Sequence, residues 1–249
     1  MGKLADKLRE LARGGGQPIG FAGMAARTQT PRMLVGTHLD APDQQAVEDA
    51  VQSGADVILF QAGPATTDDM FKTFGTAGQR AMWGGILAMG GRDEVERLSK
   101  AKSDFVVLGS GTINADALLA ENIDKVLEID ASWDDMLLRT VDQLPITAVL
   151  YRALGAEDLT VQHLMQCQKI IALARKPAFV LLPPAVGVRS LTLLRDAGVY
   201  GVVVPPGAVK DFRMAVHELP APKRREERME ATLPAPGHGH EHDEDEDDD

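Results

Sequence analysis

The chain has 249 residues, a formal net charge of −11, 44% hydrophobic residues and a single cysteine. One cysteine excludes a disulfide scaffold, and the acidic balance argues against nonspecific nucleic-acid binding, which needs clustered lysine and arginine. No apolar run reaches the roughly 20 residues of a membrane-spanning helix, and the N-terminus lacks the apolar stretch of a secretory signal. We therefore expect a cytoplasmic protein with neither membrane nor nucleic-acid partners.

Residues 1–30 are predicted to precede the main domain. An amphipathic pattern indicates a helix from about Lys3 to Ala12. The segment PIGFAGMAA at 18–26 is interpreted as a short extra strand or as a plug over the bottom of that domain. The alternative is that this segment is itself the first strand of the domain, which would shift the later count by one.

Residues 31–218 are predicted to form that domain, because eight short aliphatic runs alternate there with longer amphipathic segments. Near-continuous apolar character over four or five residues is typical of a parallel strand buried on both faces. The runs are MLVGTHL (33–39), DVILFQ (56–61), GGILAM (84–89), FVVLGS (105–110), KVLEID (125–130), TAVLYR (147–152), FVLLPP (179–184) and GVVVPP (201–206).

Helical patterns separate these runs, for example at 41–54, 91–103, 132–144, 159–176 and 188–198. Several begin with Asp or Ser near an N-cap position, and Gly54 and Gly198 are predicted to end helices. Eight strand-helix units match the count and size of a closed (β/α)8 barrel, the TIM barrel, with an N-terminal helix. An open doubly wound sheet would usually have fewer units and a glycine-rich turn after its first strand.

Residues 219–249 are predicted to be a linker and a disordered acidic tail. Pro-rich stretches flank a charged segment with few large apolar side chains, so it cannot offset the entropy of ordering. The eight carboxylates within 241–249 carry most of the charge, leaving −3 for residues 1–240. His238, His240 and His242 alternate there, and they would form a loose divalent-metal site in an extended chain. A solvated polyanion is the simpler interpretation.

In TIM barrels the reacting groups lie at the carboxyl ends of strands and in the loops that follow. Glu128 is the most informative residue so placed, because alternation puts Val126, Glu128 and Asp130 on one face of their strand and Leu127 and Ile129 on the other. Glu128 should then point into the barrel near its mouth. Such a charge needs a partner, and Arg152 on the neighbouring strand is expected to supply it. Two interpretations stay open, a general base or a structural salt bridge.

His38 and Asp40 are predicted to share a face of the first strand, as a base and the group that orients it or as metal ligands with Glu128 as a third. Alternatively, Asp40 is the N-terminal cap of the next helix. Cys167 and His163 fall within one helical pattern and are interpreted as packing or surface residues. No lysine ends a strand, which disfavours a Schiff-base aldolase.

The segment AVGVRSLTLLRDAGVYGVVVPPGAV (185–209) resembles the last quarter of ribulose-phosphate-binding and related FMN-binding TIM barrels, and AVEDAVQSGADVILFQAG (46–63) resembles an early unit of them. The resemblance implies that backbone amides of the loops after strands seven and eight bind a phosphate. Carried over by position, the seventh loop contains Gly187, Arg189 and Ser190, and the eighth contains Gly207.

This sequence departs from the resemblance at four prolines. Pro205 and Pro206 stand where those families have Gly-Ser, and Pro183 and Pro184 follow the seventh strand. Proline has no N–H to donate, so the sequence predicts degenerate phosphate loops.

We therefore expect a lyase or isomerase acting on a small anionic metabolite, with Glu128 as base, His38 as acid or base and Arg152 holding an anion. The predicted substrate site comprises Thr37, Gln61, Ser110, Asp130, Gly187, Arg189, Ser190 and Gly207. No cofactor is required by the sequence. The alternatives are a catalytically silent barrel used for binding or assembly, for instance as a homo-oligomer, and metal handling by the tail.

Overall fold

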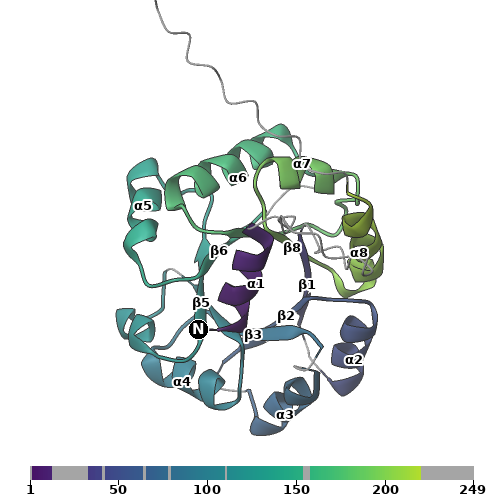
Figure 1. The fold of residues 1–249 in the computed structure, drawn as a ribbon. Helices are drawn as coiled ribbons and strands as arrows, with labels where there is room; N and C mark the ends of the chain where they lie inside the picture. The colour runs from purple at the N-terminus through teal and green to yellow at the C-terminus, as the bar shows by residue number, and fades with distance from the viewer. Residues whose placement is uncertain are drawn as a thin grey trace, which may run out of the picture.

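Eight parallel strands close into a barrel in which each strand pairs with the next along the chain and β8 pairs with β1 (Figure 1). The structure is a computed structural model that describes residues 2–12, 33–40, 43–63, 66–77, 80–109, 111–153 and 158–219. The strands are β1 (Leu34–Leu39), β2 (Val57–Ala62), β3 (Met82–Leu87), β4 (Phe105–Gly109), β5 (Asp124–Ile129), β6 (Ala148–Arg152), β7 (Ala178–Leu181) and β8 (Gly201–Val204). Each strand overlaps one of the eight aliphatic runs, which confirms the predicted fold.

Helices surround this barrel (Figure 1). They are α2 (Gln44–Gln52), α3 (Asp68–Ala77), α4 (Arg92–Lys100), α5 (Asp135–Thr140), α6 (Val161–Ala174), α7 (Ser190–Asp196) and α8 (Val209–Glu218), with the 3-10 turns η1 (Ala115–Leu119), η2 (Val141–Gln143) and η3 (Pro206–Ala208). Gly54 and Gly198 follow α2 and α7 with φ of 88° and 94°, which confirms them as helix stops. Between β4 and β5 the short connection forms η1 rather than the α-helix that a regular strand-helix unit would have.

The apolar side chains divide into two clusters because successive residues of a strand point to opposite faces. On β5, Val126 belongs to the barrel interior, whereas Leu127 and Ile129 belong to the layer between strands and helices. This is the predicted alternation, and it directs Glu128 to the interior side.

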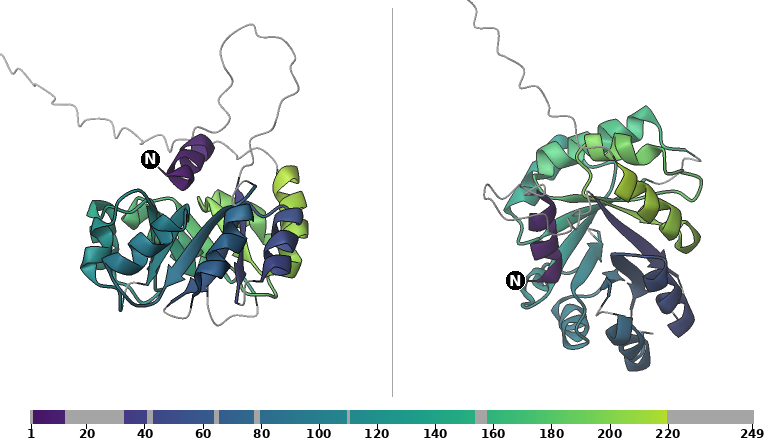
Figure 2. Two further views of the ribbon diagram at one scale, coloured as in Figure 1. Left: turned by 90° about the horizontal axis from the view of Figure 1, so that it is seen from below. Right: turned by 45° about the vertical axis from the view of Figure 1, so that its right-hand side comes forward.

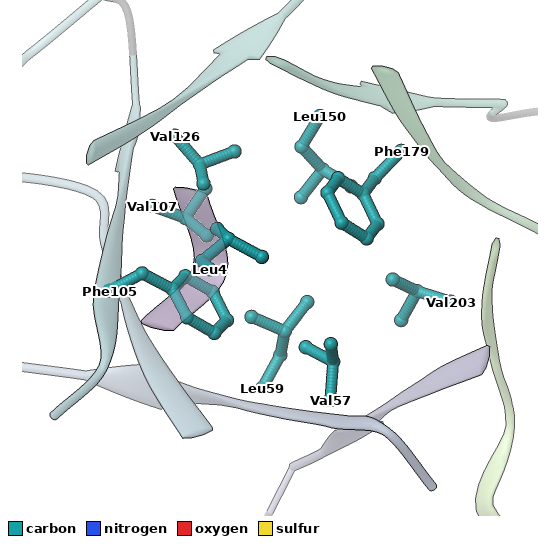
Figure 3. A pocket seen from close by; sticks show the side chains of 9 residues that line it. All are labelled: Leu4, Val57, Leu59, Phe105, Val107, Val126, Leu150, Phe179 and Val203. Atoms are coloured by element: carbon teal, nitrogen blue, oxygen red, sulfur yellow. The ribbon is translucent and has the colours of Figure 1, made fainter. Parts of the chain in front are cut away.

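Two phenylalanine rings occupy the barrel interior towards its amino end (Figure 3). Each ring lies over a glycine of the neighbouring strand. Phe105 pairs with Gly84, and Phe179 pairs with Gly201. A Cβ built on either glycine would lie 2.5 Å from a ring carbon, so only glycine leaves room for these rings. The remaining cavity among these side chains is apolar and measures about 10 Å³, so the interior is packed towards the amino end of the barrel.

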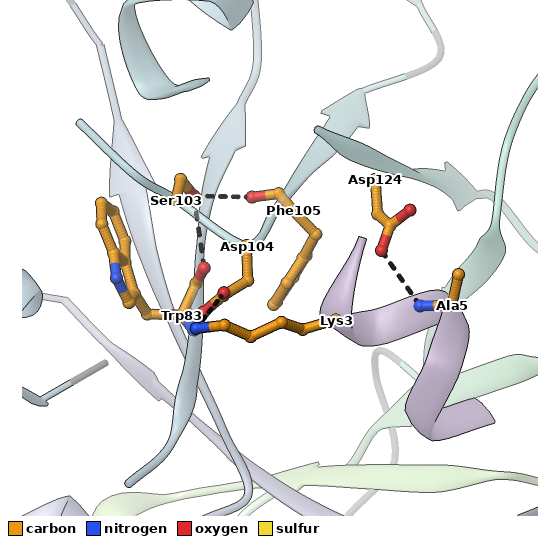
Figure 4. Close-up of polar contacts among 7 residues, drawn as sticks. All are labelled: Lys3, Ala5, Trp83, Ser103, Asp104, Phe105 and Asp124. Atoms are coloured by element: carbon orange, nitrogen blue, oxygen red, sulfur yellow. Dashed lines mark hydrogen bonds and ion pairs between the residues drawn. The ribbon is translucent and has the colours of Figure 1, made fainter. Parts of the chain in front are cut away.

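Helix α1 (Lys3–Ala12) covers the amino end of the barrel (Figure 2). Leu4 and Leu8 are 0% and 3% exposed and pack into the interior cluster. The Asp124 carboxylate accepts a hydrogen bond from the Ala5 amide in the first turn of the helix at 3.0 Å, and the Lys3 ammonium lies 2.9 Å from Asp104 (Figure 4). The predicted helix is therefore confirmed with its bounds, and it closes this end.

Two other predictions fall outside the described residues. These are the strand or plug at 18–26 and the linker and tail at 219–249, of which only Leu219 is described, as a buried residue after α8. Among the helices of the described ranges, none is long and apolar enough to cross a membrane.

Candidate functional site at the carboxyl end of the barrel

The carboxyl end of the barrel brings three of the predicted residues into one cluster. His38 lies near the end of β1, Glu128 near the end of β5 and Arg152 at the end of β6. The charges of Glu128 and Arg152 both act on His38, although β1 is remote from β5 and β6 in the sequence. Each of the three side chains is only about a quarter exposed, at 23%, 24% and 27%. They form a half-buried polar group at the mouth, which we call the mouth cluster.

Within the mouth cluster, Glu128 and Arg152 form the ion pair that the sequence predicts. Arg152 Nε donates to Glu128 Oε1 at 2.8 Å. The pairing uses one of the five N–H donors of the guanidinium and fixes its plane. Among the described residues the terminal Nη nitrogens of Arg152 have no hydrogen-bond partner, so they are available to an anion.

The two nitrogens of the His38 imidazole have different surroundings. Nδ1 lies 3.3 Å from the Asp40 carboxylate, whereas Nε2 is buried and has no hydrogen-bond partner among the described residues. Burial lowers the pKa of His38; the Asp40 and Glu128 charges oppose that shift and Arg152 adds to it. A neutral ring that keeps its proton on Nδ1, on the side of Asp40, carries its lone pair on Nε2. In that form the His38 ring has a desolvated acceptor on Nε2.

Asp40 itself does not cap the following helix. The N-cap of α2 is Asp43, whose carboxylate accepts from the Ala46 amide at 2.7 Å. The capping interpretation of Asp40 is therefore wrong, because the helix begins one turn later. The metal interpretation also fails for His38, Asp40 and Glu128, since within the described part of the chain no three His, Cys, Asp or Glu side chains form a metal-binding group. His238, His240 and His242 lie outside that part.

The other predicted substrate residues occupy varied positions. Gln61 at the end of β2 is exposed and donates from Nε2 to the Ile86 carbonyl at 3.2 Å. Thr37 is fully buried and its hydroxyl donates to the Val204 carbonyl at 2.9 Å, so it links β1 to β8. Asp130 is exposed and accepts from the Ser132 amide at 2.7 Å. Ser110 lies outside the described residues.

The loops after β7 and β8 contain the remaining candidates. Gly187, Arg189 and Gly207 are exposed, and Ser190 begins α7. Several amides there are already engaged, because Val186 donates to the Pro183 carbonyl, Ser190 to that of Gly187 and Ala208 to that of Pro205. The barrel-facing wall next to Arg152 is Leu181 of β7, a half-buried residue that the sequence could not distinguish from core.

Two residues of α6 are predicted to be packing or surface groups. Cys167 is 2% exposed, and burial raises the pKa of its thiol to about 12, so it is a packing residue. The His163 ring accepts from the Thr160 amide at 3.1 Å in a capping box at the start of the helix. Neither faces the mouth cluster, since both belong to the helix layer.

Comparison with known proteins gives similarity in structure alone. No protein-family model matches the chain, and no curated protein matches it. KGPDC from Streptococcus mutans superposes with a TM-score of 0.61 at 14% identity over 75% of this chain and 98% of that one. Phosphoribosyl anthranilate isomerase from Thermus thermophilus superposes with a TM-score of 0.59 at 12% identity, covering 76% of this chain and 100% of that one.

A third similar structure is the tryptophan synthase α-subunit from Pyrococcus furiosus. It superposes with a TM-score of 0.60 at 15% identity over 74% of this chain and 93% of that one. The TM-scores establish a shared fold, whereas identities this low leave the activity open. The chain thus shares the TIM-barrel fold of these three structures.

Proposed function

We propose that this barrel is a lyase or isomerase that moves a proton on a small anionic metabolite. The observation that supports the proposal is Nε2 of His38, which is buried without a partner among the described residues, in a side chain on which the charges of Glu128 and Arg152 act. A buried polar atom without a partner costs free energy, roughly 1–3 kcal/mol, and sites that tolerate such a cost are often functional. A substrate C–H or O–H group directed at Nε2 would give this atom a partner and so remove the free-energy cost.

The sequence favours Glu128 as the base, but the geometry supports a different division of roles. Glu128 Oε1 already accepts from Arg152, whereas the His38 lone pair is unengaged among the described residues. We therefore assign removal of the proton to His38. Glu128 holds the guanidinium in place and offers Oε2 as the second acid or base, and Asp40 orients the His38 ring.

The proposed step balances without an oxidant or a reductant. A C–H bond next to a carbonyl or carboxylate breaks, its electron pair moves onto that group as an enolate, and the proton forms an N–H bond on His38 Nε2. The new negative charge lies beside Arg152, where it is stabilised. An isomerase then returns the proton to a neighbouring atom, and a lyase expels a leaving group from the next carbon.

Deuterium exchange tests this proposal whichever product forms, because it reports removal of the proton itself. The full chain is incubated in D2O with a panel of small oxo and hydroxy acids, both phosphorylated and unphosphorylated, and mass spectrometry follows the gain of one mass unit. We expect enzyme-dependent exchange into at least one compound and a loss of at least 100-fold in His38→Asn, because general acid–base catalysis contributes roughly 10²–10⁴-fold.

His163→Asn is the matched control, since His163 lies in α6 away from the mouth cluster. It should exchange at the wild-type rate. Equal exchange by His38→Asn and wild type would overturn the assignment of the base, and absence of exchange into every compound would contradict the proton-transfer reaction itself.

An alternative function is assembly by a catalytically silent barrel. The observation in its favour is a set of exposed apolar side chains on the neighbouring helices α5 and α6, namely Met136, Leu137, Val161 and Met165. Two of these, Met136 and Val161, are 80% and 72% exposed. Self-association through this surface predicts a sedimentation coefficient that falls to the monomer value in Met136→Lys. A wild-type monomer would contradict this alternative.

A further inference from the structure

We propose that the mouth cluster recognises a carboxylate, held by Arg152 at the end of β6, in preference to a phosphate held by the loops after β7 and β8. The inference rests on the proposed function in one respect, that the ligand binds at the carboxyl end of the barrel. It names the chemical class of that ligand, and it assigns the anion site to a strand end instead of the loops that contain the prolines.

The loops after β7 and β8 contain four prolines and three amides that donate within the loops, while the Gly187, Val188, Arg189 and Gly207 amides donate to no described residue. Pro183, Pro184, Pro205 and Pro206 have no N–H, and the Val186, Ser190 and Ala208 amides already donate within the loops. Phosphate recognition by backbone requires several N–H groups that converge on one point. The four prolines remove four of the N–H groups in these loops.

Arg152 supplies side-chain donors at the mouth itself. Its Nε bond to Glu128 at 2.8 Å orients the planar guanidinium and leaves the two Nη groups without a partner among the described residues. Two parallel N–H donors match the two oxygens of a carboxylate, and this bidentate geometry is the strongest one available to arginine.

Charge favours a monoanion in this position. Arg152 and Glu128 neutralise one another, and burial lowers the pKa of His38, so that ring contributes little positive charge at neutral pH. The three residues of the mouth cluster therefore sum to a net charge near zero before a ligand binds, and the exposed Asp40 carboxylate beside His38 adds one negative charge. A phosphate dianion would add two charges to a half-buried group that already contains the Glu128 carboxylate, whereas a carboxylate adds one.

The wall beside Arg152 is apolar. Leu181 is the register partner of Arg152 on β7, Val203 pairs with Leu181 on β8, and Pro205 follows that strand. Low polarity on this side strengthens the contact between guanidinium and carboxylate. In a 2-hydroxy acid bound through its carboxylate, the adjacent carbon carries the C–H bond that the proposed step breaks, and in a 2-oxo acid that bond lies one carbon further along. Both classes of short acid therefore fit the proposed chemistry.

The first experiment uses the wild-type chain and two probes, pyruvate and inorganic phosphate. Histidine is labelled with ¹⁵N, and the two ring nitrogens of His38, assigned with His38→Asn, are followed by NMR during titration. We expect pyruvate to shift the Nε2 resonance with saturation, and phosphate to bind at least tenfold more weakly. Phosphate affinity equal to or greater than that of pyruvate would overturn the proposal.

Variants then locate the anion. Arg152→Gln should weaken pyruvate at least tenfold, whereas Arg139→Gln on the exposed face of α5 should bind it like wild type. Arg189→Gln is the opposing test, because a loss of binding there and not in Arg152→Gln would return the anion to the loop after β7. If circular dichroism shows that Arg152→Gln does not fold, two other measurements decide whether Arg152 binds the carboxylate. These are the comparison of the two probes on wild type and pyruvate binding by Arg152→Lys, which keeps the charge without the planar guanidinium.

These titrations need no turnover, so they separate the two proposals. If deuterium exchange occurs but pyruvate binds equally well without Arg152, this inference is overturned and the proposed function stands. If pyruvate binds selectively through Arg152 but no compound exchanges, the proposed function is overturned and this inference stands.

Discussion

The two ends of the barrel treat buried polar groups in opposite ways. At the amino end the aspartates at the strand starts all have partners: Asp56 accepts from the Val35 amide and Arg213, Asp104 from the Trp83 amide and Lys3, and Asp124 from the Ala5 amide and Thr147. At the carboxyl end His38 Nε2 is buried with no partner among the described residues.

This difference separates stability from function. Satisfied hydrogen bonds at the amino end tie strands together and anchor α1, as Figure 4 shows for Asp104 and Asp124, and they give the barrel a rigid base. At the carboxyl end, by contrast, His38 Nε2 has no partner among the described residues, and a bound ligand would supply one. Substitutions at the amino end should therefore lower stability, whereas substitutions at the carboxyl end should weaken ligand binding or catalysis.

The largest stability effect is expected from Leu4→Ala. Leu4 is fully buried and lines the small cavity inside the barrel, so its truncation enlarges a void that cannot collapse (Figure 3). We expect a loss of about 2–5 kcal/mol in the free energy of unfolding, measured by urea denaturation. Leu119→Ala, at a residue that is 64% exposed, is the matched control and should change little. A small effect of Leu4→Ala would mean that α1 does not close the barrel in solution.

Asp104→Ala should have the next largest effect. Its carboxylate accepts from the Trp83 amide at 3.0 Å and lies 2.9 Å from Lys3, and its side chain is only 5% exposed. Removal leaves a buried N–H without an acceptor and detaches one contact of α1, which should cost about 1–3 kcal/mol. Asp158→Ala, at an exposed position, provides the reference. Equal unfolding midpoints for the two variants would contradict the role assigned to the amino end.

Glu128→Gln should change stability by at most about 1 kcal/mol, because the ion pair with Arg152 is about a quarter exposed and partly screened. Its effect on exchange or pyruvate binding should be much greater, since the orientation of Arg152 is lost. Thermal unfolding and the pyruvate titration measure the two quantities on one sample. A collapse of the fold would show instead that the pair is structural.

The smallest effect is expected for the pH dependence contributed by His38. Because burial lowers its pKa in the folded state below the ordinary 6.5, the unfolded chain binds the proton more readily. The contribution to stability is therefore complete above about pH 6.5 and is lost as the pH falls through the folded pKa. Wild type should lose more stability than His38→Asn between pH 7 and pH 5, measured by urea denaturation. The opposite order would require a raised pKa.

Strand alternation predicts one part of the candidate site and leaves another part open. Glu128 and Arg152 are expected to pair because they end neighbouring strands on the same face, and the 2.8 Å contact follows from that geometry. Asp40 is ambiguous between two roles, because a cap and an orienting carboxylate look alike in sequence. Asp56, Asp104 and Asp124 each lie at the start of an aliphatic run. Their carboxylates accept hydrogen bonds from backbone amides of neighbouring elements, and only the folded structure brings these groups together.

The sequence by itself determined the eight strands, the helix Lys3–Ala12 and the inward direction of Glu128, because these depend on local periodicity and on residue order. Only the tertiary structure decided that α1 covers the amino end, that two phenylalanines occupy the space left by glycines, and that His38 Nε2 has no partner among the described residues. Closure of the barrel brings β1 beside β8 and across from β5, and such long-range packing and burial have no local pattern to reveal them.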